Sequence, residues 1–145
     1  MTVRRIMSSN VVYLTPDDTV SRAAKLMARH NIGILPVCSK DGRLRGIVTD
    51  RDIALRCVAF GNPAEETTLR EIMTRGSVTV SPEDDVMRAA EIMAREKVRR
   101  LPVLENGKLS GMLSLSDIAL RESLKSEVAK TFADISHPPK RFGLM

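Results

Sequence analysis

Thr15-Pro16-Asp17-Asp18-Thr19-Val20 opens a stretch of sequence that the chain repeats, 66 positions later, as Ser81-Pro82-Glu83-Asp84-Asp85-Val86. The same offset carries Leu35-Pro36-Val37 onto Leu101-Pro102-Val103, and it shortens by one residue after the following turn. A duplicated unit of this length predicts two similar halves in a two-fold arrangement, with clefts shared between them. Function is therefore expected in those clefts rather than in one isolated motif.

Each half predicts an amphipathic helix soon after its Thr-Pro or Ser-Pro pair. Thr15 and Ser81 are the expected N-caps, because each precedes a proline and has an aspartate three residues later. The apolar positions then follow the i, i+3, i+4, i+7 spacing of a helix face. They are Val20, Ala23, Ala24 and Met27 in the first half, and Val86, Ala89, Ala90 and Met93 in the second.

A hairpin and a closing helix complete each half. The predicted strands are 34–38 and 44–49 in the first half, and 101–104 and 109–114 in the second; Asp41-Gly42 and Asn106-Gly107 supply turn pairs that tolerate positive φ. The closing helices are expected from Thr49 to about Phe60-Gly61, and from Ser114 to about Phe132. With short opening strands at 10–14 and 77–80, the order is strand–helix–strand–strand–helix, twice. This order predicts an α+β fold.

The expected organisation is a first repeat over residues 1–61, a linker over 62–68, a second repeat over 69–124, and a C-terminal helical extension with a tail over 125–145. With 145 residues, 43% of them hydrophobic, the two repeats can share one compact body.

Composition narrows the classes of function. The net charge of +5 suits an anionic partner, but the basic residues are spread among acids, and one Tyr, three Phe and no Trp offer few platforms for nucleic-acid bases. No apolar run reaches the ~20 residues of a membrane helix, and no signal peptide is visible, which predicts a cytoplasmic protein. Cys38 and Cys57 are expected to be reduced, buried thiols, although a redox pair stays open. No metal-ligand spacing and no catalytic Ser/His/Asp or Cys/His set is present, so we expect no metal and no enzyme.

Thr49-Asp50-Arg51-Asp52 and Ser114-Leu115-Ser116-Asp117 are the stretches with the most chemical content. Each follows a glycine-initiated apolar strand and opens a helix. A hydroxyl at the N-cap with a carboxylate three residues later is first of all a capping box. The alternative is half of a nucleotide site, in which the hydroxyl contacts phosphate at a helix start and the carboxylate accepts the two hydroxyls of a ribose.

The chain resembles a tandem cystathionine-β-synthase (CBS) domain pair, also called a Bateman module. The resemblance spans about residues 3–124. In the first half its motifs are Ile6-Met7, Thr15-Pro16, the Ala23-Ala24…Met27 helix, Ile32-Gly33-Ile34-Leu35-Pro36-Val37 and Gly46-Ile47-Val48-Thr49-Asp50-Arg51-Asp52-Ile53. In the second half they are Ile72-Met73, Ser81-Pro82, Ala89-Ala90…Met93, Val98-Arg99-Arg100-Leu101-Pro102-Val103 and Gly111-Met112-Leu113-Ser114-Leu115-Ser116-Asp117-Ile118.

The resemblance implies binding of adenosyl ligands between the repeats. Carried over by position, one ligand set is Ile47, Thr49, Asp52, Val78, Arg99, Arg100 and Pro102. The other is Val11, Val12, Gly33, Ile34, Pro36, Met112, Ser114 and Asp117. The second set offers adenine a small, backbone-rich wall, whereas the arginines of the first either reach phosphate or lie at the surface. AMP, ADP, ATP, S-adenosylmethionine and dinucleotides all stay open as the ligand.

The resemblance also implies a homodimer formed through helices, and a free-standing module that acts on a protein partner in trans. The leading interpretation is thus a regulatory, ligand-binding protein that is not an enzyme. The alternative is a structural or dimerisation module whose pockets are empty and whose capping boxes only stabilise helices.

Overall fold

The computed structural model describes residues 1–137, with the backbone alone of Glu122, and it confirms the α+β fold. The chain divides into two compact units. One contains residues 10–77 and 104–109; the other contains residues 1–9, 78–103 and 110 onwards. Each unit has its own hydrophobic core and the main part of one two-stranded antiparallel hairpin; the tip of the second hairpin, residues 104–109, is grouped with residues 10–77.

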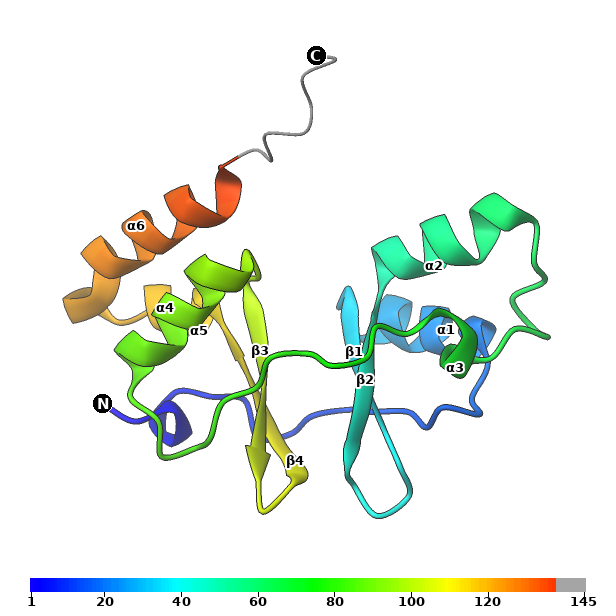
Figure 1. Ribbon diagram of the computed structural model, residues 1–145, viewed down its shortest axis with the longest axis horizontal. Helices are drawn as coiled ribbons and strands as arrows, with labels where there is room; N and C mark the ends of the chain where they lie inside the picture. Colours follow the sequence, from blue (N-terminus) through cyan, green and yellow to red (C-terminus); the bar gives the residue numbers. More distant parts are fainter. Residues whose placement is uncertain (138–145) are drawn as a thin grey trace. The chain divides into compact units, whose positions relative to one another are not determined.

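The unit built on residues 10–77 has a hairpin covered by helices (Figure 1). Its elements are α1 (Val20–His30), β1 (Ile34–Cys38), β2 (Leu44–Thr49), α2 (Asp50–Arg56), the 3₁₀ turn η2 (Val58–Phe60) and α3 (Leu69–Ile72). The predicted strands match the observed ones, with Pro36 opposite Ile47. Val20 and Ala23 of α1, Leu35 of β1 and Leu69 of α3 are fully buried in its core.

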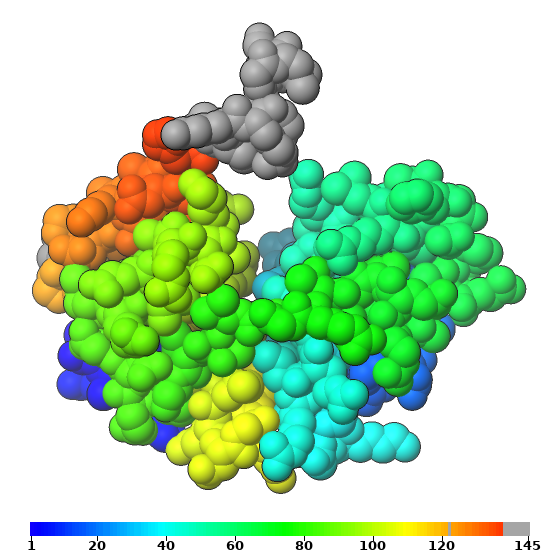
Figure 2. All heavy atoms as spheres, in the orientation of Figure 1, coloured from blue at the N-terminus to red at the C-terminus, as the bar shows by residue number. Residues whose placement is uncertain are grey.

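The other unit repeats this plan and adds two pieces. Its elements are η1 (Val3–Arg5), α4 (Val86–Glu96), β3 (Arg100–Glu105), β4 (Lys108–Ser114), α5 (Leu115–Ala119), η3 (Glu122–Leu124) and α6 (Lys125–Ser136). The added pieces are the N-terminal segment Met1–Ser9 and helix α6, which packs against α4 and α5 (Figures 1 and 2). In the β3–β4 turn, Asn106 and Gly107 both have positive φ, as the turn prediction requires.

The Thr-Pro and Ser-Pro pairs form turns rather than the expected helix starts. Thr15 N–H donates to Asp18 Oδ2 at 2.8 Å, which closes a turn, and α1 begins only at Val20 with Thr19 as its N-cap. In the second half Asp85, not Ser81, caps α4. The predicted N-caps were therefore wrong by four residues.

The carbonyls of these turns accept hydrogen bonds from distant segments instead of from a helix that continues the turn, so the helices start later. The N–H groups of Leu69 and Arg70 donate to the carbonyls of Asp18 and Pro16 at 2.9 and 3.0 Å. The matching carbonyls of Asp84 and Pro82 accept from Val3 and Arg4, both at 2.9 Å. Each turn thus receives the start of a short helix from a segment distant in sequence.

Two further expectations are corrected. The opening segments at 10–14 and 77–80 each form a single parallel bridge, Leu14 with Val37 and Val80 with Val103, instead of a strand. The second closing helix is not continuous to Phe132, because α5 ends at Ala119 and η3 separates it from α6. The predicted tail from Pro138 onwards lies outside the described residues.

Candidate functional site

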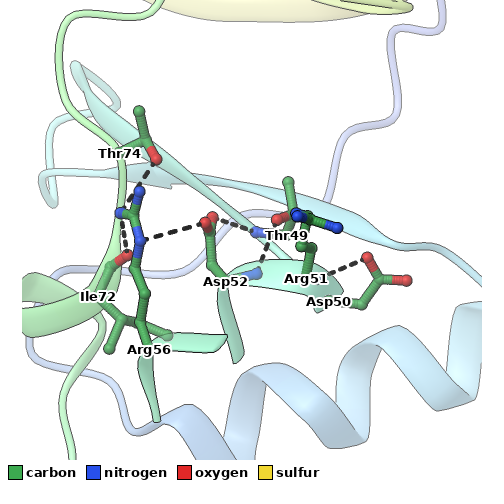
Figure 3. A network of polar contacts seen from close by, with 7 residues as sticks. All are labelled: Thr49, Asp50, Arg51, Asp52, Arg56, Ile72 and Thr74. Atoms are coloured by element: carbon green, nitrogen blue, oxygen red, sulfur yellow. Dashed lines mark hydrogen bonds and ion pairs between the residues drawn. The ribbon is translucent and has the colours of Figure 1, made fainter. Parts of the chain in front are cut away.

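Thr49 and Asp52 form a complete capping box at the start of α2 (Figure 3). The Asp52 N–H donates to Thr49 Oγ1 at 3.0 Å, and the Thr49 N–H donates to Asp52 Oδ2 at 2.9 Å. The Asp52 side chain is only 13% exposed. The structural interpretation of this motif is therefore correct, and any ligand role must be compatible with a carboxylate already engaged through one oxygen.

The second oxygen of Asp52 faces Arg56, one helical turn later. Arg56 Nε lies 3.7 Å from Asp52 Oδ1, and its NH1 donates to the Ile72 carbonyl at 3.1 Å and to Thr74 Oγ1 at 3.4 Å (Figure 3). Arg56 therefore links the start of α2 to the segment after α3. A guanidinium beside this oxygen competes with any ribose hydroxyl for it.

Ser114 and Asp117 form the same box at the start of α5, with distances of 2.8 and 3.0 Å. The residue that matches Arg56 is Arg121, but α5 ends at Ala119, so Arg121 lies beyond the helix. Within residues 1–137, no ion pair or hydrogen bond reaches Asp117 Oδ1. The two carboxylates therefore differ: Asp52 has both oxygens engaged, and Asp117 keeps one open.

Gly33 and Arg99 occupy matching places just before the first strand of each hairpin. The Gly33 carbonyl accepts from Asp50 N–H at 2.9 Å, and the Arg99 carbonyl accepts from Leu115 N–H at 2.8 Å. The backbone contact is conserved between the halves while the side chain changes from none to a guanidinium. Both Arg99 and Arg100 are exposed.

A hollow of about 290 Å³ lies at the start of α5, within the unit that contains α4, α5 and α6, which is called the second unit below. It is lined by Arg99, Arg100, Ser114, Leu115, Ser116, Ala119, Val128 and Phe132. The structure thus gathers Arg99, Arg100 and Ser114 around one hollow, although the family resemblance distributes them between two ligand sets. Val128 and Phe132 come from α6 and were not predicted. The signal that could have found Phe132 is its rarity, because the chain has only three phenylalanines.

The other predicted ligand residues belong to the frame of each unit. Ile47 pairs with Thr74 and Met112 with Ser8 across antiparallel bridges. Pro36 and Pro102 are buried in their strands. The remaining positions, Val11, Val12, Ile34 and Val78, are partly buried.

The two cysteines are free, buried thiols. Burial raises the pKa of Cys38 to about 11, so its thiol stays neutral at physiological pH. Cys57 Sγ donates to the Asn62 carbonyl at 3.4 Å. Within residues 1–137, no cluster of three or more His, Cys, Asp or Glu side chains is arranged to hold a metal ion. The same residues include no helix with the length and hydropathy to cross a bilayer.

Comparison with known proteins gives matches along nearly the whole chain. The CBS domain family model matches residues 3–58 and again 69–123. The CBS domain-containing protein YhcV of Bacillus subtilis is 35% identical over 135 residues, which cover 93% of this chain and 95% of YhcV.

Two solved structures have a similar fold. One is hypoxic response protein I with two coordinated zinc ions, with a TM-score of 0.78, 33% identity, and coverage of 83% of this chain and 98% of that one. The other is the CBS domain pair of protein MJ0100 in complex with 5′-methylthioadenosine and S-adenosyl-L-methionine. Its TM-score is 0.74 at 29% identity, covering 83% of this chain and 94% of that one.

Proposed function

This chain belongs to the CBS domain family and carries two copies of the domain, and we propose that it is a regulatory module that binds an adenosine-containing ligand. The observation that supports this most directly is the MJ0100 domain pair, a structural relative that holds two adenosyl compounds. The Thr49–Asp52 and Ser114–Asp117 pairs each place a carboxylate, which can accept from the ribose hydroxyls of any adenosyl compound, beside a hydroxyl that can contact the phosphate of a nucleotide.

The ligand set that contains Ser114 and Asp117 is the better candidate for the ribose. Asp117 uses one oxygen in its capping box and keeps Oδ1 open to a ribose hydroxyl. At Asp52 the corresponding oxygen faces Arg56, which a ligand must displace. The set that contains Thr49 and Asp52 is proposed as a second, weaker site.

A thermal-shift screen with AMP, ADP, ATP and S-adenosylmethionine tests this function. A ligand at 100 times its Kd should raise the free energy of unfolding by about 2.7 kcal/mol. Asp117→Ala is expected to abolish the shift and Asp52→Ala to reduce it less. Both variants also remove a cap, so a matched control is needed.

Glu71→Ala provides that control. Thr68 and Glu71 form a third capping box, with Thr68 N–H donating to Glu71 Oε2 at 2.7 Å, and neither residue belongs to a ligand set. This variant should lower the melting temperature and keep the full ligand shift. If no adenosyl compound shifts the wild-type protein, the proposed function is wrong.

We also propose that this protein forms a homodimer and acts in trans on a protein partner in the cytoplasm.

The second candidate function, a ligand-free interaction module, is favoured by one observation. Leu55, Val58 and Phe60 are 49, 64 and 74% exposed within six residues of α2 and η2, which is a dense group of apolar side chains for a surface. Unchanged melting with every ligand, together with a dimer in light scattering that Phe60→Ser dissociates, would favour this second function.

A further inference from the structure

Helix α6 forms one wall of the hollow at the start of α5. Its inner side packs on the second unit's core through Val128 and Ile135, and Thr131 between them is only 5% exposed. Lys97 Nζ donates to the carbonyls of Asp134 and His137, both at 3.3 Å, and ties the end of the helix to the end of α4. The wall is therefore fixed in place from both its inner side and its C-terminal end.

Phe132 follows Val128 by one helical turn, at the edge of the side of α6 that packs on this core, and both residues line the hollow. The Phe132 side chain remains 50% exposed, and it does not join the core cluster. An aromatic ring left half in water gains little stability for the fold. The same ring offers a flat apolar surface to a molecule that enters the hollow.

The remaining lining determines what kind of molecule would enter. Arg99 and Arg100 make no ion pair or side-chain hydrogen bond with any residue in the range 1–137, so both guanidinium groups can bind an anion. Guanidinium groups match the oxygens of a phosphate in pairs. Two cations beside an aromatic ring favour a ligand that has both an anionic group and a flat ring.

We propose that Phe132 is a ligand-contacting residue, which stacks on the base of a mononucleotide whose phosphate is bound by Arg99 and Arg100. This inference rests on the proposed function and adds a contact from α6, which begins after the last residue of the second family match. The volume of about 290 Å³ lies just below the ~300–1,000 Å³ range of small-molecule pockets. It therefore suits a mononucleotide better than a dinucleotide.

A single tryptophan can report this contact directly, because the chain contains none. Phe132→Trp in the full-length protein should show a saturable change in emission when AMP is titrated, since the base would stack on the indole. Phe60→Trp is the matched control, because Phe60 is also exposed and does not line this hollow. Its emission should not change with AMP.

Calorimetry with Phe132→Ala gives the second readout. Base–aromatic stacking predicts a loss of about 5- to 150-fold in affinity for AMP. Neutral adenosine should lose the same factor, because the change removes only the contact with the ring. The far-UV circular dichroism and melting temperature should stay close to wild type, since the side chain is half exposed.

The outcomes separate this inference from the proposed function. Wild-type binding with unchanged affinity in Phe132→Ala, or with equal emission changes at positions 60 and 132, would overturn the inference and leave the function standing. A loss for AMP but not for adenosine would overturn the stacking geometry. Failure of the wild-type protein to bind any adenosyl compound would overturn both.

Discussion

Gly46 and Gly111 should each resist replacement by alanine, because another stretch of backbone passes directly over them. A Cβ on Gly46 would lie 2.7 Å from the carbonyl oxygen of Thr74, and one on Gly111 would lie 2.6 Å from that of Ser8. Both oxygens are held by hydrogen bonds, from Ile47 N–H at 3.0 Å and from Met112 N–H at 3.0 Å. The crossing segments therefore cannot move away without losing these bonds.

The backbone contact and the usual effect of replacing glycine by alanine change the free energy of unfolding in opposite directions. Neither glycine has positive φ, so without a clash alanine would stabilise the protein by about 0.4–1 kcal/mol through the unfolded state. Overpacking against fixed backbone costs about 1–3 kcal/mol. We therefore expect Gly46→Ala and Gly111→Ala each to lower the free energy of unfolding by about 1–2 kcal/mol, measured by urea denaturation and far-UV circular dichroism.

Gly33→Ala is the matched control for this prediction. Its Cβ would lie 2.8 Å from Asp50 Oδ2, but that atom ends an exposed side chain that can rotate away. Its free energy of unfolding should stay within about 0.5 kcal/mol of wild type or rise. If all three variants are equally stable, or if Gly46→Ala and Gly111→Ala gain stability, the close backbone approach is not a constraint and the reasoning is wrong.

Two further predictions concern the caps and a buried thiol. Asp117→Ala should lower the free energy of unfolding by about 0.5–2 kcal/mol in urea denaturation, because Ser114 N–H loses its acceptor; Asp117→Asn should lose less, since its amide oxygen still accepts, and equal losses would contradict this origin. Burial raises the pKa of Cys38 from 9.0 to about 11, so the unfolded chain ionises first as pH rises. The contribution of the neutral Cys38 thiol to the free energy of unfolding should be intact below pH ~9 and fall by up to about 2.5 kcal/mol towards pH ~11. In Cys38→Ala the free energy of unfolding should depend less steeply on pH over that range. If the slope is unchanged, the loss of stability comes from other titrating groups.

The sequence was sufficient wherever structure depends on residues close together in the chain. The Asn106-Gly107 turn and the adjoining strands followed from local turn chemistry. The capping boxes at Thr49 and Ser114 followed from a hydroxyl and a carboxylate three residues apart. The repeat itself carried the α+β fold and the membership of the CBS domain family, because each motif recurs in the same order.

The same local pattern failed at Thr15, where only a distant contact distinguishes a turn from a helix start. Its carboxylate partner closes a turn, and the carbonyls of that turn are used to bind α3. Only the tertiary structure could show this, because the two segments are more than fifty residues apart in the chain.

The remaining features depend on which segments meet in space. Sequence could identify the duplicated motifs, but the packing of Met1–Ser9 with the second half and the backbone crossing above Gly111 appear only in the fold. The same is true of Phe132, which reaches the hollow beside Ser114 because α5 ends early and lets α6 turn back over α4. Local spacing in this chain determined its turns, caps and repeat, whereas contacts between distant segments decided what surrounds the candidate ligand site.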